Sequence, residues 1–156
     1  MNAEPLSHAP VRVVPPVAFL TTFCAGIALS WAWRLPALEG VARWSLGGVL
    51  FVLGFMIGIG AVTTFGRART SPNPFVATTA LVEGGPYRYS RNPMYVGMIL
   101  MYAGGAVLVR ATAALLALPL PVLAVHFGTI LPEERYLAAT FGAVYADYRA
   151  RVRRWI

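Results

Sequence analysis

Residues 44–65, WSLGGVLFVLGFMIGIGAVTTF, decide the fold class, because this stretch is apolar throughout and carries no charged side chain. A helix that crosses a bilayer needs about 20 consecutive apolar residues. Gly54 and Gly58 stand four positions apart, a spacing that permits close helix approach. We interpret them as ordinary packing glycines. The stretch therefore predicts a membrane-spanning helix that packs closely on a neighbour.

Three further apolar segments follow the same pattern, at 13–33, 94–109 and 111–131. The segment 94–109 is short for a span, and only Arg110 separates it from the next one. We predict that the two form a tight helical hairpin. The first segment is long and ends in two tryptophans, without a clear small-residue cleavage site, which favours an uncleaved helix over a signal peptide. The sequence predicts an all-α bundle of about four transmembrane helices.

The composition supports lipid as the solvent. Hydrophobic residues make up 58% of the chain and charged residues 12%, against about 45–50% and about 25% in soluble domains. The net charge is +7 and every basic residue is arginine. These arginines flank apolar runs, so a membrane orientation signal explains them better than a nucleic-acid partner. Cys24 is alone and there are two histidines, so we expect neither a disulfide nor a metal site.

The arginines also predict the orientation. With four spans, both termini share one side of the membrane with the 66–93 loop. Three arginines fall on the other side: Arg34, Arg43 and Arg110. Ten fall on the side of the termini: Arg12, Arg67, Arg69, Arg88, Arg91, Arg135, Arg149, Arg151, Arg153 and Arg154. The positive-inside rule then puts both termini and the loop in the cytosol, and we expect a prokaryotic cell membrane.

Two polar segments on that side remain, the 66–93 loop and the 132–156 tail. A loop of this length in a compact protein tends to be functional or disordered. The tail is predicted as an amphipathic helix that begins with Pro132 in its first turn. Its apolar arc spans about 100° at 3.6 residues per turn. That arc contains Leu137, Phe141, Val144, Tyr145, Tyr148 and Val152.

The loop ends in the densest polar cluster, EGGPYRYSRNPMYVG at 83–97. Asn92 followed by Pro93 predicts an N-cap with proline at the first helical position. Arg88 and Arg91 precede that helix start, where free backbone N–H groups favour anions. The two arginines could bind a carboxylate or phosphate, or they could simply anchor to lipid headgroups.

The tail opens with a second cluster, in which Glu133 and Glu134 suit the first turn of a helix dipole. The helical angle of Glu134 falls inside the apolar arc, whereas Glu133 lies at its edge. A carboxylate on a buried face needs a partner. A cationic ligand, or Arg88 or Arg91 from the loop, could supply it. His126 lies shortly before this cluster, although a lone histidine near a helix end is more often a packing residue.

The two clusters together resemble the signatures of the isoprenylcysteine carboxyl methyltransferases and their phospholipid N-methyltransferase relatives. The stretch GPYRYSRNPMYVG at 85–97 is similar to the family pattern Gly-Pro-Tyr-x-x-x-Arg-His-Pro-x-Tyr-x-Gly. The tail is similar to the family's C-terminal signature, with Glu133, Glu134, Leu137, Phe141, Gly142, Tyr145, Tyr148, Val152 and Arg153 in order. The pair of motifs is more specific than either alone.

The resemblance implies an integral membrane methyltransferase with S-adenosylmethionine as cofactor, in a single domain over 1–156. The 66–93 loop and the tail would form the cofactor pocket. We predict Arg91 and Glu134 as the residues that carry catalysis. The expected cofactor-binding residues are Tyr87, Arg88, Arg91, Asn92, Pro93, Tyr95, Gly97, Glu133, Glu134 and His126. A glutamate would hold the ammonium, an arginine or the helix N-terminus the carboxylate, and tyrosine faces the sulfonium.

One departure and two alternatives accompany this interpretation. Asn92 stands where the family usually has histidine, and asparagine cannot act as a base near pH 7. Membrane sterol reductases that use NADPH share part of the loop motif, but they have Asn and Glu where this chain has Met94 and Met98. A small four-helix transporter would rely on a carboxylate inside a span, which is absent here. We expect a lipophilic acceptor: a prenylated cysteine, a lipid amine, or a small lipophilic thiol or acid.

Overall fold

The computed structural model describes residues 9–71 and 80–156, and every regular element within them is helical, as predicted. The elements, in chain order, are α1 (Pro15–Ala32), α2 (Gly40–Arg67), the 3-10 turn η1 (Gly85–Arg88), α3 (Pro93–Leu108), α4 (Thr112–Ala117), α5 (Pro119–Val125), the π-helical turn η2 (His126–Ile130) and α6 (Leu131–Arg151).

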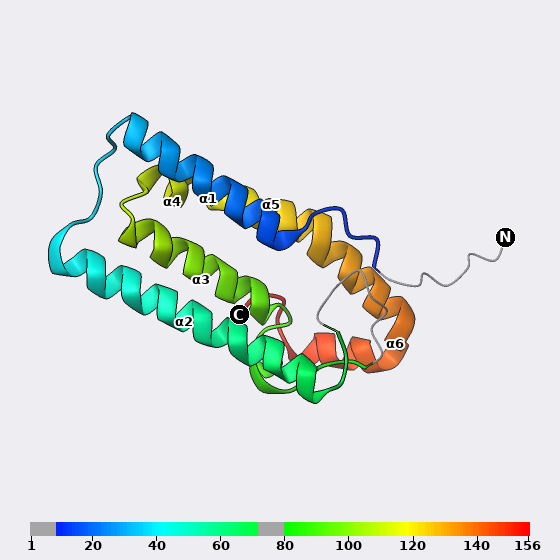
Figure 1. The fold of residues 1–156 in the computed structure, drawn as a ribbon. Coiled ribbons are helices and arrows are strands. Elements are labelled where there is room, and N and C mark those ends of the chain that lie inside the picture. The colour runs from blue at the N-terminus through cyan, green and yellow to red at the C-terminus, as the bar shows by residue number, and fades with distance from the viewer. Residues whose placement is uncertain (1–8, 72–79) are drawn as a thin grey trace.

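The helices α1, α2, α3 and the α4–α5 rod run alongside one another as an elongated bundle (Figure 1). Three apolar helical stretches are long enough to cross a membrane: α1, α2 and the rod from α4 into α6. The 16 residues of α3 rise only about 24 Å. This helix is the shorter apolar one that the sequence indicated, and its close partner is α2. The chain is therefore a multi-pass membrane protein.

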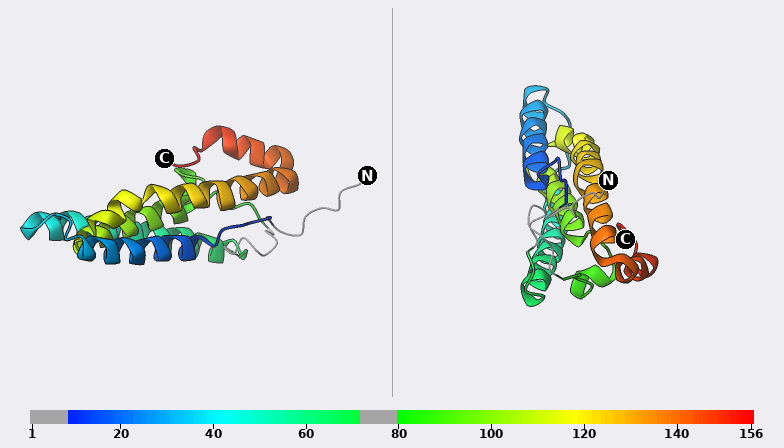
Figure 2. Two further views of the ribbon diagram at one scale, coloured as in Figure 1. Left: turned by 90° about the horizontal axis from the view of Figure 1, so that it is seen from above. Right: turned by 90° about the vertical axis from the view of Figure 1, so that its right-hand side faces the viewer.

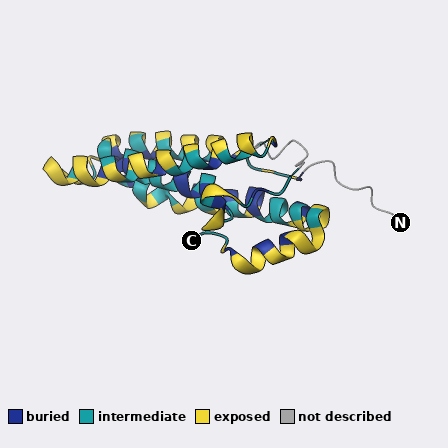
Figure 3. Ribbon diagram, turned by 90° about the horizontal axis from the view of Figure 1, so that it is seen from below, coloured by how far each residue is buried: buried dark blue, intermediate teal, exposed yellow. Residues whose placement is uncertain are grey.

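The outer surface of the bundle is exposed (Figure 3), and many of its exposed side chains are large and apolar. Large side chains such as Val49, Phe55 and Met56 on α2 have half or more of their surface exposed. A soluble protein rarely presents a continuous apolar surface of this extent. In a bilayer the same surface faces lipid, which explains why only a small fraction of α2 is buried.

Glycines bring α2 and α3 into contact. A Cβ atom on Gly97 would lie 2.7 Å from the carbonyl oxygen of Gly54, and one on Gly104 would lie 2.6 Å from that of Gly47. Both distances are too short for any side chain, so the two backbones touch. Small residues allow such close approach between membrane helices. The prediction that Gly54 serves packing is confirmed, whereas a Cβ atom on Gly58 would have no described atom within 4 Å.

The fourth span is less regular than predicted. Instead of one helix over 111–131, the chain forms α4, restarts at Pro119 as α5, and widens into the π-helical turn η2. Pro119 lacks the N–H that would continue the ladder of α4. The widened turn at η2 is held from outside: the Arg12 N–H donates to the Gly128 carbonyl at 2.8 Å, and the Thr129 hydroxyl donates to the Val13 carbonyl at 2.8 Å.

The predicted tail helix is confirmed over Leu131–Arg151, but it is bent and does not extend to residue 156. α6 bends at Gly142, where φ is 51° and ψ is −122°, a conformation that glycine adopts readily. The helix ends at Arg151, and Val152 is extended. The bend turns the second half of α6 back over the end of the bundle (Figure 2). It also changes the helical angles beyond Gly142, so Val144, predicted to face inward, is 57% exposed.

Candidate cofactor site

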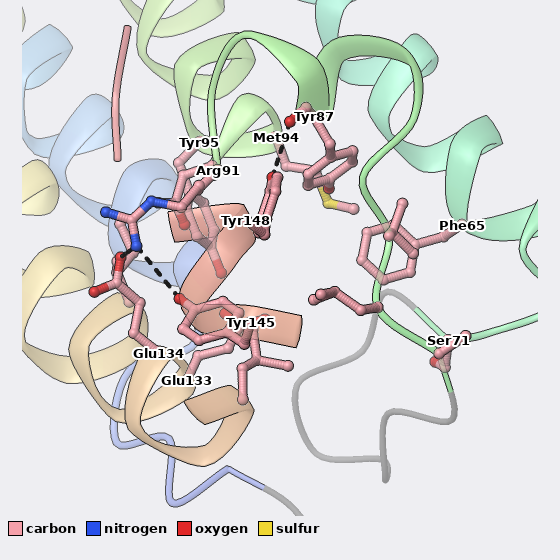
Figure 4. Close-up of a pocket in the computed structure, with 16 residues that line it drawn as sticks. Phe65, Ser71, Tyr87, Arg91, Met94, Tyr95, Glu133, Glu134, Tyr145 and Tyr148 are labelled. Carbon is pink, nitrogen blue, oxygen red and sulfur yellow. Dashed lines mark hydrogen bonds and ion pairs between the residues drawn. The ribbon is translucent and has the colours of Figure 1, made fainter. Parts of the chain in front are cut away.

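A cavity lies where the loop before α3 meets α6, at the end of the bundle that carries the tail. Its empty space is about 780 Å³, the open mouth included. Its polar lining comes from three places in the sequence: η1 with the loop end, the first turns of α3, and both halves of α6 (Figure 4).

Arg91 and Glu134 form a buried ion pair at the wall of this cavity. Arg91 Nη1 lies 2.9 Å from Glu134 Oε1, and the two side chains are only 10% and 11% exposed. A second arginine, Arg154, donates to both oxygens of Glu134, from Nε at 2.9 Å and from Nη2 at 2.8 Å. Glu134 thus has two cationic partners. The expectation that this carboxylate faces inward is confirmed, and Arg91 is one of the partners that the sequence offered.

Arg91 has a buried donor without a partner. Its Nη1 also donates to the Tyr145 hydroxyl at 3.4 Å, as Figure 4 shows. Its Nε is buried and has no hydrogen-bond partner within the residues that the structure describes. An unsatisfied buried N–H costs about 1–3 kcal/mol.

Glu133 differs from its neighbour in having no ionic partner. It lines the cavity, and it makes no hydrogen bond or ion pair within 9–71 and 80–156. It lies two residues beyond the apolar stretch that ends at Leu131. Burial, and to a lesser extent the charge of Glu134, raises the pKa of Glu133 to about 7. The carboxylate is therefore poised to ionise fully when a cation enters the cavity.

Tyrosine rings make up much of the remaining wall, with Tyr87, Tyr95, Tyr145 and Tyr148 all lining the cavity. The Tyr148 hydroxyl donates to the Tyr87 carbonyl at 2.9 Å, which ties α6 to η1. Burial raises the pKa of the Tyr87 phenol, and the charge of Glu133 adds to the effect. The phenols stay neutral, and their ring faces attract cations.

The loop end that presents Arg91 is fastened to the last residues of the chain. The Arg91 N–H donates to the Arg153 carbonyl at 2.9 Å, and the Asn92 side-chain amide donates to the Arg154 carbonyl at 2.9 Å. Asn92 does precede α3, as predicted, but its side chain makes no capping hydrogen bond. The backbone N–H of Asn92 instead meets the Ser90 hydroxyl at 3.1 Å. The predicted capping role of Asn92 is wrong, because the tail offers its side chain a carbonyl.

Comparison with protein families identifies the chain at this point. The profile of the phospholipid methyltransferase family matches residues 42–144, from α2 to the bend region of α6. The chain belongs to the phospholipid methyltransferase family. No curated protein matches the sequence. Members of this family are membrane methyltransferases that use S-adenosylmethionine and act on lipids. Neither the sterol reductase nor the transporter interpretation survives this assignment.

The cavity of this methyltransferase fits its cofactor in chemical character. S-adenosylmethionine carries an ammonium, a carboxylate and a sulfonium. The cavity is lined by the unpaired carboxylate of Glu133, by the guanidinium-bearing Arg91 and by tyrosines. Each charged group of the cofactor thus has a counterpart among the residues that line one space.

The structure brings together six of the ten predicted cofactor residues. Those that line the cavity are Tyr87, Arg91, Asn92, Tyr95, Glu133 and Glu134. The other four lie outside it. Arg88 is exposed on η1, Pro93 is buried at the start of α3, and Gly97 packs against α2. His126 stacks on Trp155 with ring centroids 6.0 Å apart.

Three residues of the candidate site were not predicted as such from the sequence. Tyr145 and Tyr148 were expected only as part of an apolar arc, although both are tyrosines within the C-terminal motif. Arg154 was expected only as a charge at the membrane surface. Nothing local in the sequence identifies it, because its partner Glu134 is 20 residues away and the bend at Gly142 brings the two together.

Proposed function

We propose that this methyltransferase methylates the amine of a lipid headgroup. The observation that carries the proposal is the tyrosine wall of the cavity, in a chain that belongs to the phospholipid methyltransferase family. Tyr87, Tyr95, Tyr145 and Tyr148 line the space, and tyrosine ring faces attract cations. An amine acceptor becomes a cation as it receives a methyl group.

A carboxylate acceptor, such as a prenylated cysteine, suits this cavity less well. The electron-rich faces of the tyrosine rings disfavour an anion. The neighbouring guanidinium of Arg91 is already engaged in a pair whose side chains are about one-tenth exposed. A lipophilic thiol or acid meets the same difficulty, since both react as anions.

The cofactor supplies a methyl group on a sulfonium. In our assignment Glu133 binds the ammonium of the cofactor, the Arg91 guanidinium faces its carboxylate, and the rings of Tyr87, Tyr95 and Tyr148 surround the sulfonium. Glu134 holds Arg91 in place. The protein's main contribution is then to orient the reactants and to exclude water.

Product chemistry tests the acceptor class. The purified protein in detergent would be given methyl-labelled S-adenosylmethionine with either phosphatidylethanolamine or an N-acylated prenylcysteine. Methylated amines resist alkali, whereas methyl esters release labelled methanol. We expect alkali-stable label on the phospholipid. Alkali-labile label on the prenylcysteine, with none on the phospholipid, would refute the proposal.

We also propose that the site faces the cytosol. The described parts of the loop (66–71 and 80–93), the tail and residues 9–14 lie at one end of the bundle (Figure 1), and ten of the 13 arginines belong to these parts. Tyr89, 78% exposed at that end, is a suitable position for labelling. A Tyr89→Cys variant in a Cys24→Ser background should resist an impermeant thiol reagent in intact cells and react after lysis. Labelling of intact cells would reverse the orientation.

A further inference from the structure

A π-helical turn stands directly before the two glutamates of the cavity. η2 covers His126–Ile130, and α6 follows it without a break, so that Glu133 and Glu134 lie in the first turn of the next helix. Ile130, the last residue of η2, is fully buried and itself lines the cavity. Turns of this kind are rare, occur mostly as single turns inside α-helices and are frequent at functional sites.

The extra residue of a π-turn changes the direction of every side chain that follows it. Each residue of an α-helix advances by about 100°, and a π-turn takes about one residue more to complete a turn. Side chains beyond the turn therefore lie one position behind those of an uninterrupted helix. If η2 closed into a regular helical turn, Glu133 would take the direction that Glu134 now has relative to α5, and Glu134 that of the exposed Arg135. The cavity would lose its unpaired carboxylate.

Residues 9–14, which we call the N-terminal clamp, contact the π-turn from outside the helix. They lie beside the junction of α5 and α6 (Figure 1), where the Arg12 N–H and the Val13 carbonyl make the two hydrogen bonds to η2 described above. The Val13 side chain fills the space beside Gly128, since a Cβ atom there would lie 2.3 Å from Val13 Cγ2. Thr129, the donor of the second hydrogen bond, is fully buried. The clamp lies outside the residues that match the family profile.

We propose that the N-terminal clamp is a positioning element of the methyltransferase site: it keeps η2 in its π-helical form and thereby directs Glu133 into the cavity. A buried backbone carbonyl needs a hydrogen-bond donor, and the clamp supplies one to Gly128 from outside the helix. The close fit of Val13 against a glycine adds a contact that depends on the position of this turn. The proposal rests on the role of Glu133 in cofactor binding, given above.

The first test displaces the clamp. Gly128→Ala places a methyl group where Val13 now packs, so the clamp has to move away from η2. We expect the affinity for S-adenosylmethionine, measured by calorimetry in detergent, to fall about tenfold, the size expected for losing the Glu133 contact. Gly48→Ala is the matched control, because nothing lies within 4 Å of a Cβ atom on this glycine of α2. Its affinity should equal that of the wild type.

A milder variant keeps the test valid if Gly128→Ala does not fold. Thr129→Val preserves the shape of the side chain and removes the hydroxyl that donates to the Val13 carbonyl. We expect a loss of affinity of about threefold, in keeping with one neutral hydrogen bond. Thr140→Val is its control, since that hydroxyl donates to the Tyr136 carbonyl within α6. It should bind S-adenosylmethionine like the wild type.

Deletion of Phe127 separates the direction of the glutamates from general support of the fold. Phe127 is 63% exposed. Without it η2 has the length of a regular helical turn, and both glutamates keep their present directions. Combined with Gly128→Ala, the deletion should therefore restore most of the lost affinity, because the shorter turn no longer needs the clamp.

Three outcomes would overturn the proposal. The first is wild-type affinity in both Gly128→Ala and Thr129→Val. The second is a loss that the deletion of Phe127 does not restore, which would mean that the clamp only supports the fold. The third is a further loss when Thr129→Val is added to Glu133→Gln, since a clamp that acts through Glu133 has nothing left to direct in that background. If Glu133→Gln itself bound like the wild type, the cofactor role of Glu133 would fall and this proposal with it. If Glu133→Gln lost affinity and the clamp variants did not, this proposal alone would fall.

Discussion

Each end of the bundle holds a glutamate–arginine pair that joins segments far apart in the sequence. The two pairs differ in how far they are exposed to solvent. At one end Glu39, before α2, pairs with Arg110, after α3, and their side chains are 65% and 52% exposed. At the other end Glu134 pairs with Arg91, at 11% and 10%. The residue types are the same, so the difference lies in burial.

Burial changes what such a pair does. Exposed pairs contribute about 0–1 kcal/mol, because water screens them and mobile side chains resist being held. A buried pair gains more Coulomb energy but also loses hydration, so its net contribution to stability is small, whereas removing one partner is costly. The exposed pair, Glu39 with Arg110, links the segment before α2 to the turn after α3. The buried pair, with Arg154, shapes a cavity in which another charge, Glu133, is left for a ligand.

The largest effect is expected from breaking the buried network. Glu134→Gln leaves Arg91 without its carboxylate and Arg154 with a neutral partner. We expect a loss of roughly 3 kcal/mol in stability, seen as a lower thermal unfolding midpoint in detergent without cofactor. A midpoint equal to that of the wild type would show that water reaches this network and that its burial has little consequence.

The sequence predicted the inward direction of Glu134 for a partly correct reason. The helical angle was valid for the stretch before Gly142, so Glu134, Leu137 and Phe141 were placed on the right side. Beyond the bend the same angles failed for Val144. Gly142 stood in the motif, but nothing local distinguishes a glycine that bends a helix from one that lets it pack. Tyr145, Tyr148 and Val152, which also follow the bend, are buried as the arc predicted, so Val144 is the exception.

The next effect concerns the unpaired carboxylate. Sequence reasoning favoured Glu134 as the ligand for the cofactor's ammonium, but the structure gives that residue two arginines. We now expect Glu133→Gln to weaken S-adenosylmethionine binding by about tenfold to a hundredfold, or roughly 1.5–3 kcal/mol. Glu83→Gln is a fitting control, since Glu83 pairs with Arg151 outside the cavity. Equal affinities in wild type and Glu133→Gln would exclude the assignment.

The same variant should be more stable without cofactor, and the gain should depend on pH. The pKa of Glu133 rises from 4.5 to about 7 on folding, so the folded chain binds the proton more tightly than the unfolded chain does. Stability from this group is then lost as pH rises from about 4.5 through about 7. We expect Glu133→Gln to melt higher than wild type near pH 7.5, and the difference to vanish near pH 4.5. A difference in melting temperature that does not vary with pH would contradict a buried Glu133 carboxyl with a raised pKa.

Binding should show the opposite trend with pH. An ammonium binds the ionised form of Glu133, so wild-type affinity for S-adenosylmethionine should rise as pH increases toward about 7. Below that value the slope approaches tenfold per pH unit, or about 1.4 kcal/mol. The range should stay below about pH 7.5, because α-amino groups lose their proton near 7.7–8.0. The affinity of Glu133→Gln for S-adenosylmethionine should not vary with pH over this range. An equal pH dependence in both proteins would mean that another group titrates.

Several features of the site could not be read from the chain because they depend on contacts between distant segments. The spans and the hairpin at Arg110 follow from hydropathy, which needs no tertiary information. The position of Asn92 before α3 follows from its proline neighbour. The hydrogen bond from its side chain to Arg154 does not, since 62 residues separate the two. Similarly, the burial of Glu133 and the pairing of Glu134 with Arg154 depend on where residues 152–156 pack against the bundle.

The smallest effect on stability is expected at the exposed pair, and it can be compared directly with the loss expected for Glu134→Gln. Arg110 stands in the turn between α3 and α4 with φ at 61°, a left-handed conformation. Arg110→Gln removes the ion pair with Glu39 and keeps a side chain of similar length at the same backbone angle. Since the pair is exposed, its loss should cost about 0.2–1 kcal/mol. Salt should already weaken the wild-type pair, because the Debye length falls from about 10 Å at 0.1 M to about 3 Å at 1 M. The melting difference between Arg110→Gln and wild type should therefore shrink at high salt, whereas that of Glu134→Gln should persist. If Arg110→Gln cost as much as Glu134→Gln at both salt concentrations, burial would not be what separates the two ends.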